Sequence, residues 1–252
     1  MKRFLLISLF LIAFIPVNSQ KWEQVWSDEF NYEGLPDSTK WSNEVGFIRN
    51  KELQYYTSGR IENSKVRNGN LLIIGRKEQY KNAEYTSASL VTDGKYYMTY
   101  GKIDARIKLQ KGQGMWPAIW MLGQNHHQVG WPGCGEIDIM EHINDEDIMY
   151  GTLHWLNEKH VSSGGTAKCD VGKYHNYAVE WDKDAIKWFL DGNKYWEVSI
   201  KDSMNSTEEF NKPFYIILNL AIGGNWPKNP DPTTILPDTM FVDYVRIYQI
   251  KK

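Results

Sequence analysis

Residues 102–109 read Lys-Ile-Asp-Ala-Arg-Ile-Lys-Leu, and polar and apolar side chains alternate through the whole stretch. Successive side chains of a β-strand point to opposite faces, so this period of two predicts a strand with one buried face. Residues 71–74, 186–190 and 241–248 are further short runs rich in β-branched and aromatic side chains. Residues 191–193, Asp-Gly-Asn, tolerate positive φ and predict a hairpin turn between two such runs.

Helical periodicity is weak in this sequence. No window of helical length sustains an apolar period of 3.6, and the best candidate, residues 199–210, is short and polar. No repeat, low-complexity tract or Pro-rich linker divides the chain after its first twenty residues. The pattern therefore predicts one all-β domain over residues 20–252, built as a sandwich or a barrel.

The N-terminal segment has the composition of an export signal. Lys2 and Arg3 precede an apolar run over residues 4–17, which is too short for a bilayer span, and residues 17–19 resemble a cleavage signal. We expect residues 1–19 to be a signal peptide, removed near Ser19, and the mature protein to be periplasmic, surface-held or secreted without a membrane association. A short membrane anchor is the alternative.

Charge and cysteine content narrow the possible partners. The 252 residues include 29 Lys and Arg against 31 Asp and Glu, a net charge of −2, which argues against nucleic-acid binding. Aromatic residues reach 14%, a content typical of large β-cores or of sites that stack flat ligands. Only Cys134 and Cys169 are present, and their sequence positions leave open whether they pair.

Three carboxylates fall within six positions of an otherwise apolar run, Glu136, Asp138 and Glu141. In a regular strand Glu136 and Asp138 share a face, whereas Glu141 points the opposite way. One extra residue at Ile139 or Met140, a β-bulge, would return Glu141 to that face. The two Glu side chains could then approach the ~5–5.5 Å separation at which one carboxylate attacks an anomeric carbon and the other protonates the leaving oxygen.

Other interpretations of this cluster are a solvated acidic edge strand and a Ca²⁺ or Mg²⁺ site. An exposed strand should alternate with basic or hydroxyl side chains, and this one carries no positive residue. A zinc hydrolase is disfavoured because no His-Glu-x-x-His motif occurs.

The sequence resembles glycoside hydrolase family 16. The Glu136-x-Asp138-x-x-Glu141 spacing matches the family signature, and further similar motifs occur in the expected order. These motifs are residues 100–108, residues 112–122 with the Gly-Met-Trp-Pro core, residues 151–155 (Gly-Thr-Leu-His-Trp), residues 223–227 (Gly-Gly-Asn-Trp-Pro) and residues 242–248. Residues 100–108 and 112–122 are similar to the laminarinase-like branch. The bulged spacing resembles that of laminarinases, agarases and carrageenases, whereas strict mixed-linkage lichenases have the unbulged spacing.

The resemblance implies a β-jelly-roll with a substrate cleft on the concave sheet and retaining endo-hydrolysis without a catalytic cofactor. By the same resemblance Glu136 is the nucleophile, Asp138 its assistant and Glu141 the general acid/base. The implied substrate is β-1,3-glucan or mixed-linkage β-1,3-1,4-glucan, with a galactan such as agarose, porphyran or carrageenan as the alternative. Lys228 and Cys134 depart from the common pattern near the cleft mouth, so specificity there could differ.

Candidate substrate-binding residues follow from spacing and from the resemblance. Trp116 and Trp120 are four residues apart and would face one way on a strand, where they could stack sugar rings, with ordinary core positions as the alternative. The other candidates are His154, Trp226, Arg76 and Asn50. The resemblance also suggests a structural Ca²⁺ held by Glu29, Asp243 and the carbonyl of Gly69.

A non-catalytic glucan-binding module on the same sandwich is the rival function, because fold does not imply activity. Binding modules have no need for a buried acidic cluster, and all three carboxylates are present here. We therefore expect an enzyme that acts on a β-glucan as a monomer.

Overall fold

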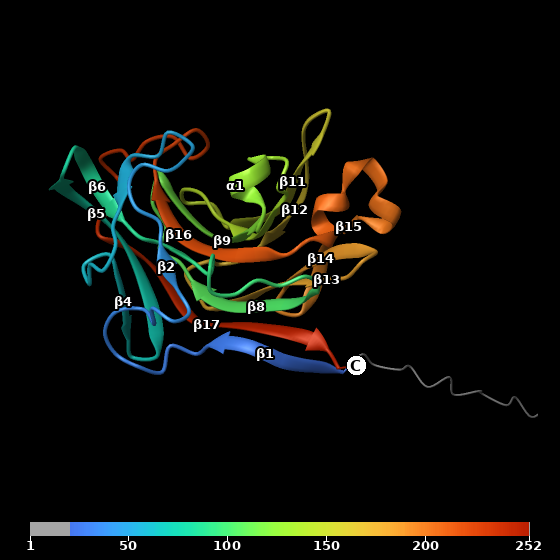
Figure 1. Ribbon diagram of the computed structural model, residues 1–252. Helices are drawn as coiled ribbons and strands as arrows, with labels where there is room; N and C mark the ends of the chain where they lie inside the picture. The colour runs from blue at the N-terminus through green and yellow to red at the C-terminus, as the bar shows by residue number, and fades with distance from the viewer. Residues whose placement is uncertain (1–20, 252) are drawn as a thin grey trace, which may run out of the picture.

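The structure is a computed structural model that describes residues 21–251. The expected signal peptide, residues 1–19, lies outside the described residues. Two sheets lie one above the other. The seven-stranded sheet, called the inner sheet below, lies above the ten-stranded outer sheet in Figure 1. The predicted all-β sandwich is therefore confirmed, and it has the jelly-roll form.

The outer sheet is built around the strand predicted from residues 102–109. Its order is β15 (Asn193–Ser199), β14 (Ala185–Leu190), β13 (His175–Trp181), β8 (Gly101–Lys108), β17 (Asp238–Ile250), β5 (Asn70–Tyr80), β6 (Ala83–Ser87) and β3 (Gln54–Tyr56), with β1 (Trp22–Asp28) on β17 and β4 (Ser64–Arg67) on β5. Pairing is antiparallel except between β3 and β6. Strand β8 alternates buried and half-buried residues along its whole length, as its sequence predicts.

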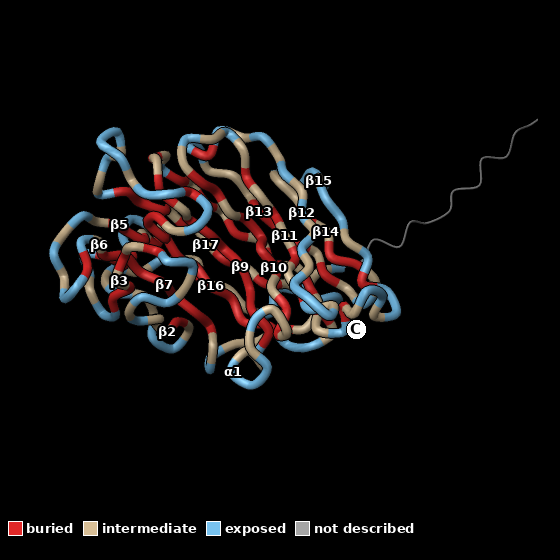
Figure 2. Tube along the Cα trace, turned by 90° about the horizontal axis from the view of Figure 1, so that it is seen from above, coloured by how far each residue is buried: buried red, intermediate tan, exposed pale blue. Residues whose placement is uncertain are grey.

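The inner sheet carries the site. Its order is β12 (Lys159–Lys168), β11 (Ile148–Asn157), β10 (Glu136–Glu141), β9 (Met115–Gly123), β16 (Phe214–Ile222), β7 (Ser89–Val91) and β2 (Ser42–Asn43). Seen from above, β16, β9, β10, β11 and β12 run side by side (Figure 2). Every residue of β16 is buried, because both of its faces are covered. Leu218 and the alternate residues on its face pack between the two sheets, whereas Ile217, on the opposite face, belongs to an apolar cluster with Trp120.

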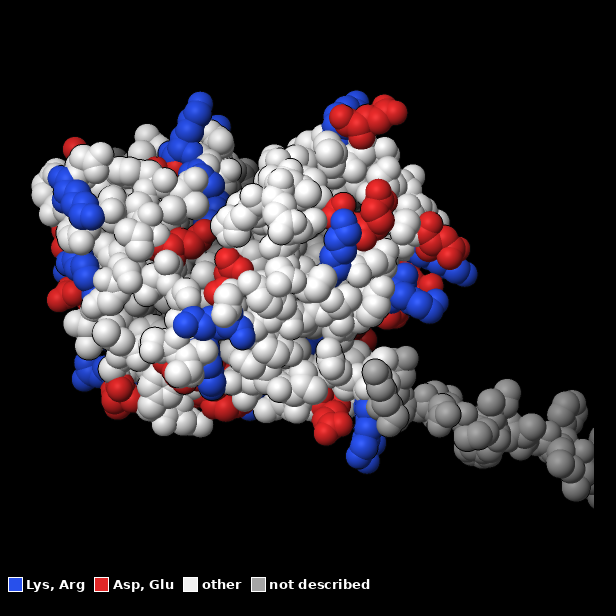
Figure 3. All heavy atoms as spheres, in the orientation of Figure 1, with Lys and Arg blue, Asp and Glu red and all other residues white. Residues whose placement is uncertain are grey.

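In the part of the chain that the structure describes, helical structure is confined to three short segments, α1 (His126–Val129) and the 3₁₀ helices η1 (Lys201–Ser206) and η2 (Glu208–Asn211). Both 3₁₀ helices overlap the helical candidate predicted at residues 199–210, and η2 extends one residue beyond it, to Asn211. Within residues 21–251 no helix is long and apolar enough to cross a membrane. Acidic and basic side chains are interspersed on the face shown in Figure 3, consistent with the near-neutral net charge.

The two cysteines are not bonded to each other. Cys134 is buried beside β10, and Cys169 is half-buried with its Sγ 3.8 Å from the Tyr177 hydroxyl. The sequence left open whether these two cysteines pair, and in the structure they form no disulfide.

Candidate active site

A β-bulge in β10 places the three carboxylates on one face. Against β9, Asp138 is opposite Trp120 and Met140 is opposite Ile119, so Ile139 is the additional residue. Ile139 and Met140 are both buried in the core between the sheets. The register shift predicted from the spacing of the acids is confirmed, and Glu136, Asp138 and Glu141 all line the same cavity.

This cavity lies on the inner sheet and has a volume of about 300 Å³. Its walls combine aromatic, amide and charged side chains, which is typical of a site for a polyhydroxylated ligand. The lining residues are Glu44, Ile48, Arg49, Asn50, Glu52, Trp116, Ala118, Trp120, Leu122, His126, Trp131, Glu136, Asp138, Glu141 and Asn219.

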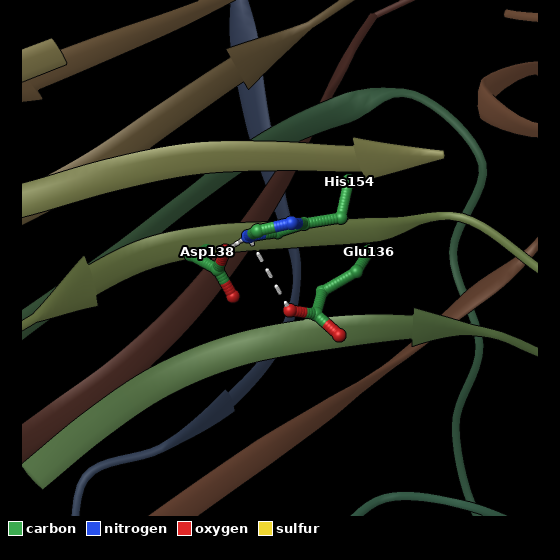
Figure 4. A group of neighbouring side chains, drawn as sticks. All are labelled: Glu136, Asp138 and His154. Atoms are coloured by element: carbon green, nitrogen blue, oxygen red, sulfur yellow. Dashed lines mark ion pairs between the residues drawn. The ribbon is translucent and has the colours of Figure 1, made fainter. Parts of the chain in front are cut away.

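Glu136 is held by the indole of Trp131 and faces an imidazole. The Trp131 Nε1–H donates to Glu136 Oε2 at 2.9 Å, and His154 Nε2 lies 3.8 Å from Oε1. Glu136 and His154 are opposite each other on β10 and β11, which brings the two side chains together (Figure 4). The indole thus holds one carboxylate oxygen and leaves Oε1 free to meet a ligand.

Asp138 is the most enclosed of the three acids, with 2% of its surface exposed. Its Oδ2 lies 3.3 Å from the same His154 Nε2. Figure 4 marks this ion pair with a dashed line. The Trp188 Nε1–H donates to the Asp138 carbonyl oxygen at 2.8 Å, and this bond anchors the strand from the core side. Asp138 therefore has little freedom to turn away from His154.

Glu141 is fixed by the aromatic wall of the cleft. The Trp116 Nε1–H donates to Glu141 Oε1 at 2.9 Å. The Trp116 ring packs edge-on against Trp226, with centroids 5.5 Å apart, and Trp226 packs in the same manner against Tyr150 at 4.9 Å. Two of the three acids thus receive a hydrogen bond from a Trp indole, one on each side of Asp138.

Burial and mutual repulsion keep protons on this cluster. Burial, and then the charge of Asp138, raises the pKa of Glu136 well above its usual range. Burial and the charge of Glu141 raise the pKa of Asp138 well above its usual range. Burial likewise raises the pKa of Glu141, against the opposing effect of the Trp116 hydrogen bond. Three adjacent acids in a low-dielectric site cannot all ionise, so the site can present a carboxylate and a carboxylic acid together.

Most of the predicted binding residues meet at this cavity. Trp116 and Trp120 line it from β9, as their spacing predicts, and Asn50 lines it from the loop before β3. Trp120 is only 7% exposed, its Nε1–H donates to Asn219 Oδ1 at 2.7 Å, and the guanidinium of Arg49 lies 4.9 Å from its ring centroid. Trp120 therefore serves as floor rather than as an open stacking platform.

Two further candidates lie beside the cavity rather than on its floor. His154 contacts two of the acids from β11. Trp226, 37% exposed, supports Trp116 at the rim. The backbone N–H of Asn225 donates to the Asn50 carbonyl oxygen at 3.0 Å, so the loop that carries Trp226 and the loop that carries Asn50 are joined.

Arg76 is not among the cavity-lining residues, and its role in substrate binding stays a prediction. It lies on β5 of the outer sheet, where its Nε is 3.7 Å from Glu78. Its place near the end of an apolar run gave no indication of which sheet it would join.

The suggested calcium ligands do not fit a cation as they are arranged. The Glu29 carboxylate accepts hydrogen bonds from Arg246, the shortest at 2.8 Å, and Asp243 Oδ2 accepts from Arg106 at 2.5 Å. Gly69 lies in the turn between β4 and β5. Guanidinium groups already pair with both carboxylates of the suggested set, and their charge would repel a Ca²⁺.

Among the described residues, one group of acids and histidines could hold a metal ion. It consists of Glu136, Asp138 and His154, whose potential ligand atoms all lie within 4.8 Å of one another. Carboxylate and imidazole can bind transition metals. Here the Trp131 indole already donates to Glu136, and His154 Nε2 lies within ion-pair distance of both carboxylates.

Several cavity residues were missed by sequence reasoning. Trp131 is 48% exposed and donates to Glu136, which is only five residues away. Its Gly-Trp-Pro-Gly sequence is typical of a turn, so an exposed Trp at the edge of the site could have been predicted there. Arg49, Glu52 and Asn219 come from loops and strands distant in sequence, and only folding brings them together.

Comparison with known proteins decides the family. The model of the family described as "Glycosyl hydrolases family 16" matches residues 51–246, most of the chain and all three carboxylates. The chain belongs to glycosyl hydrolase family 16.

Relatives within family 16 cover nearly the whole chain. A β-glucanase of Rhodothermus marinus is 43% identical over 245 residues, which cover 90% of this chain and 85% of the relative. The catalytic domain of an endo-1,3-β-glucanase (laminarinase) from Thermotoga petrophila is 42% identical and superposes with a TM-score of 0.86, covering 92% of this chain and all of that one. A family 16 enzyme described as a non-specific endo-β-1,3(4)-glucanase is 38% identical with a TM-score of 0.83, and the match covers 94% of each chain.

These findings confirm the resemblance on which the family assignment rested. The protein is a glycoside hydrolase by family membership, and its cavity carries the full set of three acids.

Proposed function

We propose that the protein is a retaining endo-β-glucanase that hydrolyses β-1,3-glucan and mixed-linkage β-1,3-1,4-glucan. The observation that carries the proposal is the bulged strand β10, which sets Glu136 and Glu141 on the floor of one cavity on either side of Asp138. The similarity to β-1,3-glucanases and to a non-specific β-1,3(4)-glucanase supports the substrate class.

The proposed reaction has two displacements. Glu136 Oε1 attacks the anomeric carbon, while the carboxylic acid of Glu141 donates its proton to the leaving glycosidic oxygen. The raised pKa of Glu141 keeps that proton available, and the Trp131 indole holds Glu136 Oε2 away from the reacting carbon. Glu141, now ionised, then deprotonates a water that attacks the glycosyl–Glu136 ester and releases the sugar.

Asp138 assists Glu136 in this scheme. Its charge, when present, opposes ionisation of Glu136, and His154 lies between the two. When Glu136 becomes an ester and loses its charge, Glu141 gains one as it gives up its proton, so the net charge of the cluster is unchanged and Asp138 need not gain or lose a proton.

Substrate specificity tests the proposal directly. We expect laminarin, barley β-glucan and lichenan to be cut, with the early fall in viscosity that cleavage within the chain produces, and cellulose, xylan and starch to be left intact. Product analysis on these polysaccharides, with agarose, porphyran and carrageenan included, would measure this. Activity on a galactan alone would overturn the glucan assignment and keep the chemistry, and binding without cleavage would favour a binding module.

Export of the protein is a separate proposal, supported by Lys2, Arg3 and the apolar run over residues 4–17. Mass spectrometry of the protein recovered from outside the cytoplasm should find Gln20 as its first residue. A retained N-terminal segment would contradict cleavage near Ser19.

Replacing Trp131 with Phe should lower kcat about tenfold or more, because a hydrogen bond to an ionised carboxylate is lost while the ring remains. Steady-state kinetics on laminarin would measure the effect, and Tm should change little because Trp131 is half exposed. The matched control is Trp196→Phe, an exposed Trp of β15 on the outer sheet. Unchanged kcat in Trp131→Phe would show that the indole N–H does not support Glu136.

Deleting Ile139 tests the bulge. A strand without the extra residue would still set Glu141 on the cavity face, so hydrolysis should remain detectable, whereas the loss of a buried Ile should lower Tm by about 5–10 °C. Ile137→Ala is the control, since it removes buried apolar surface without changing the register. Activity as low as in a Glu141 variant would mean that the deletion turns Glu141 away from the cavity.

A further inference from the structure

A second histidine, His160, lies against the cluster described above. It comes from the start of β12, near the hairpin that joins β12 to β11, and it is exposed on its outer side. His160 Nε2 lies 2.9 Å from His154 Nδ1, and the two rings stack with centroids 5.1 Å apart and an interplanar angle of 19°. This contact is short enough to be a hydrogen bond between the two rings.

Trp131 covers another side of His160. Their ring centroids are 4.6 Å apart, and the same indole donates to Glu136. His160 therefore touches Trp131 and His154, which both lie against the carboxylate of Glu136, and these four residues form a closed ring of contacts. Through these contacts the position of the His160 ring can affect the position of Glu136, with no contact needed between His160 and a sugar.

The hydrogen bond between the rings also has a chemical consequence. His154 Nε2 lies 3.3 Å from Asp138 Oδ2 and 3.8 Å from Glu136 Oε1. An ionised carboxylate can only accept a hydrogen bond, so in the reactive form with Glu136 ionised this nitrogen carries the hydrogen. In neutral His154 the opposite nitrogen, Nδ1, then has only a lone pair and needs a donor. The Nε2–H of His160 is placed to be that donor.

We propose that His160 is a positioning residue for the hydrolysis, because it orients the His154 ring and holds it in the tautomer that has hydrogen on Nε2. The kinetic part of this inference rests on the proposed function. Burial and the nearby His154 lower the pKa of His160, which favours the neutral form that donates in this way.

The first test needs no substrate. Long-range ¹H–¹⁵N spectra at about pH 8, above the ordinary His pKa of about 6.5, distinguish the two neutral tautomers of an imidazole. The His154 signals are assigned from a His154→Gln variant. We expect His154 to be the Nε2–H tautomer in the unmodified protein and to lose this preference in His160→Ala, and an Nδ1–H tautomer in the unmodified protein would overturn the inference.

The second test is kinetic. His160→Ala should lower kcat about five- to tenfold on laminarin with little change in KM, because an oriented hydrogen bond is lost. His160→Gln, whose amide can still donate, should recover at least half of the lost activity, and His127→Ala, an exposed His beside Asp93, is the matched control. Unchanged kcat in His160→Ala, or no recovery in His160→Gln, would contradict a donor role.

A double-mutant cycle shows whether His160 acts through His154. In a His154→Gln background, His160→Ala should lower kcat by no more than about twofold. A full additive loss would mean that His160 acts by another route and would overturn the inference. A protein that cut no polysaccharide would refute the proposed function, while the tautomer of His154 would still decide this inference.

Discussion

Replacing Glu136 with Gln is expected to lower kcat on laminarin by about 10⁴-fold or more, because a neutral amide cannot attack the anomeric carbon. The Gln side chain has nearly the same shape, so Trp131 and His154 can remain in place around it. Laminari-oligosaccharide affinity, measured by calorimetry, should stay within a few-fold. Tm should stay equal or rise, since burial disfavours the charge that is removed.

Glu180→Gln provides the control for this experiment. Glu180 lies on β13 of the outer sheet, away from the cavity lining, and the substitution makes the same chemical change. Its kcat should be unchanged. A Glu136→Gln protein with near-normal rates would be incompatible with Glu136 as the nucleophile.

Replacing Glu141 with Ala should lower the hydrolysis of natural glucans by about 10²–10⁴-fold, because the leaving sugar oxygen then departs without a proton. Aryl glycosides with good leaving groups should still form the glycosyl–enzyme at a substantial rate, since those groups need little protonation. Added azide should then accelerate turnover by attacking the intermediate in the space that the carboxylate occupied. The product to be identified by NMR is a β-glycosyl azide, with retained configuration.

Glu141→Gln separates the loss of the acid from the loss of the Trp116 hydrogen bond, because its amide oxygen can still accept from the indole. Both variants should lose activity on glucans, whereas only the Ala variant offers azide a space. Failure of azide to form a retained product in Glu141→Ala would show that another residue is the acid/base.

The sequence was informative where a local period determines structure. The alternation in residues 102–109 predicted β8, and the spacing of Glu136, Asp138 and Glu141 predicted a bulge, because a single strand must alternate its faces. The spacing of Trp116 and Trp120 likewise predicted a shared face. Each of these predictions depends on residues that are neighbours along one strand.

Contacts between distant segments were outside the reach of that reasoning. Arg49, Asn219 and His160 reach the cluster or the cavity from loops and strands whose positions depend on the whole sheet order. Arg76 and the calcium ligands were assigned by analogy alone. The structure pairs these side chains with oppositely charged neighbours, Glu78 for Arg76, Arg246 for Glu29 and Arg106 for Asp243.

The configuration of the first product tests the central claim most directly, because the claim is that Glu136 forms a covalent intermediate while Glu141 acts from the same face of β10. Two displacements at one carbon restore the original configuration. Proton NMR of a fresh laminarin digest, recorded before mutarotation, should therefore show the β-anomer of the new reducing end appearing first. An initial α-anomer would contradict the account, because it would require a single displacement by water.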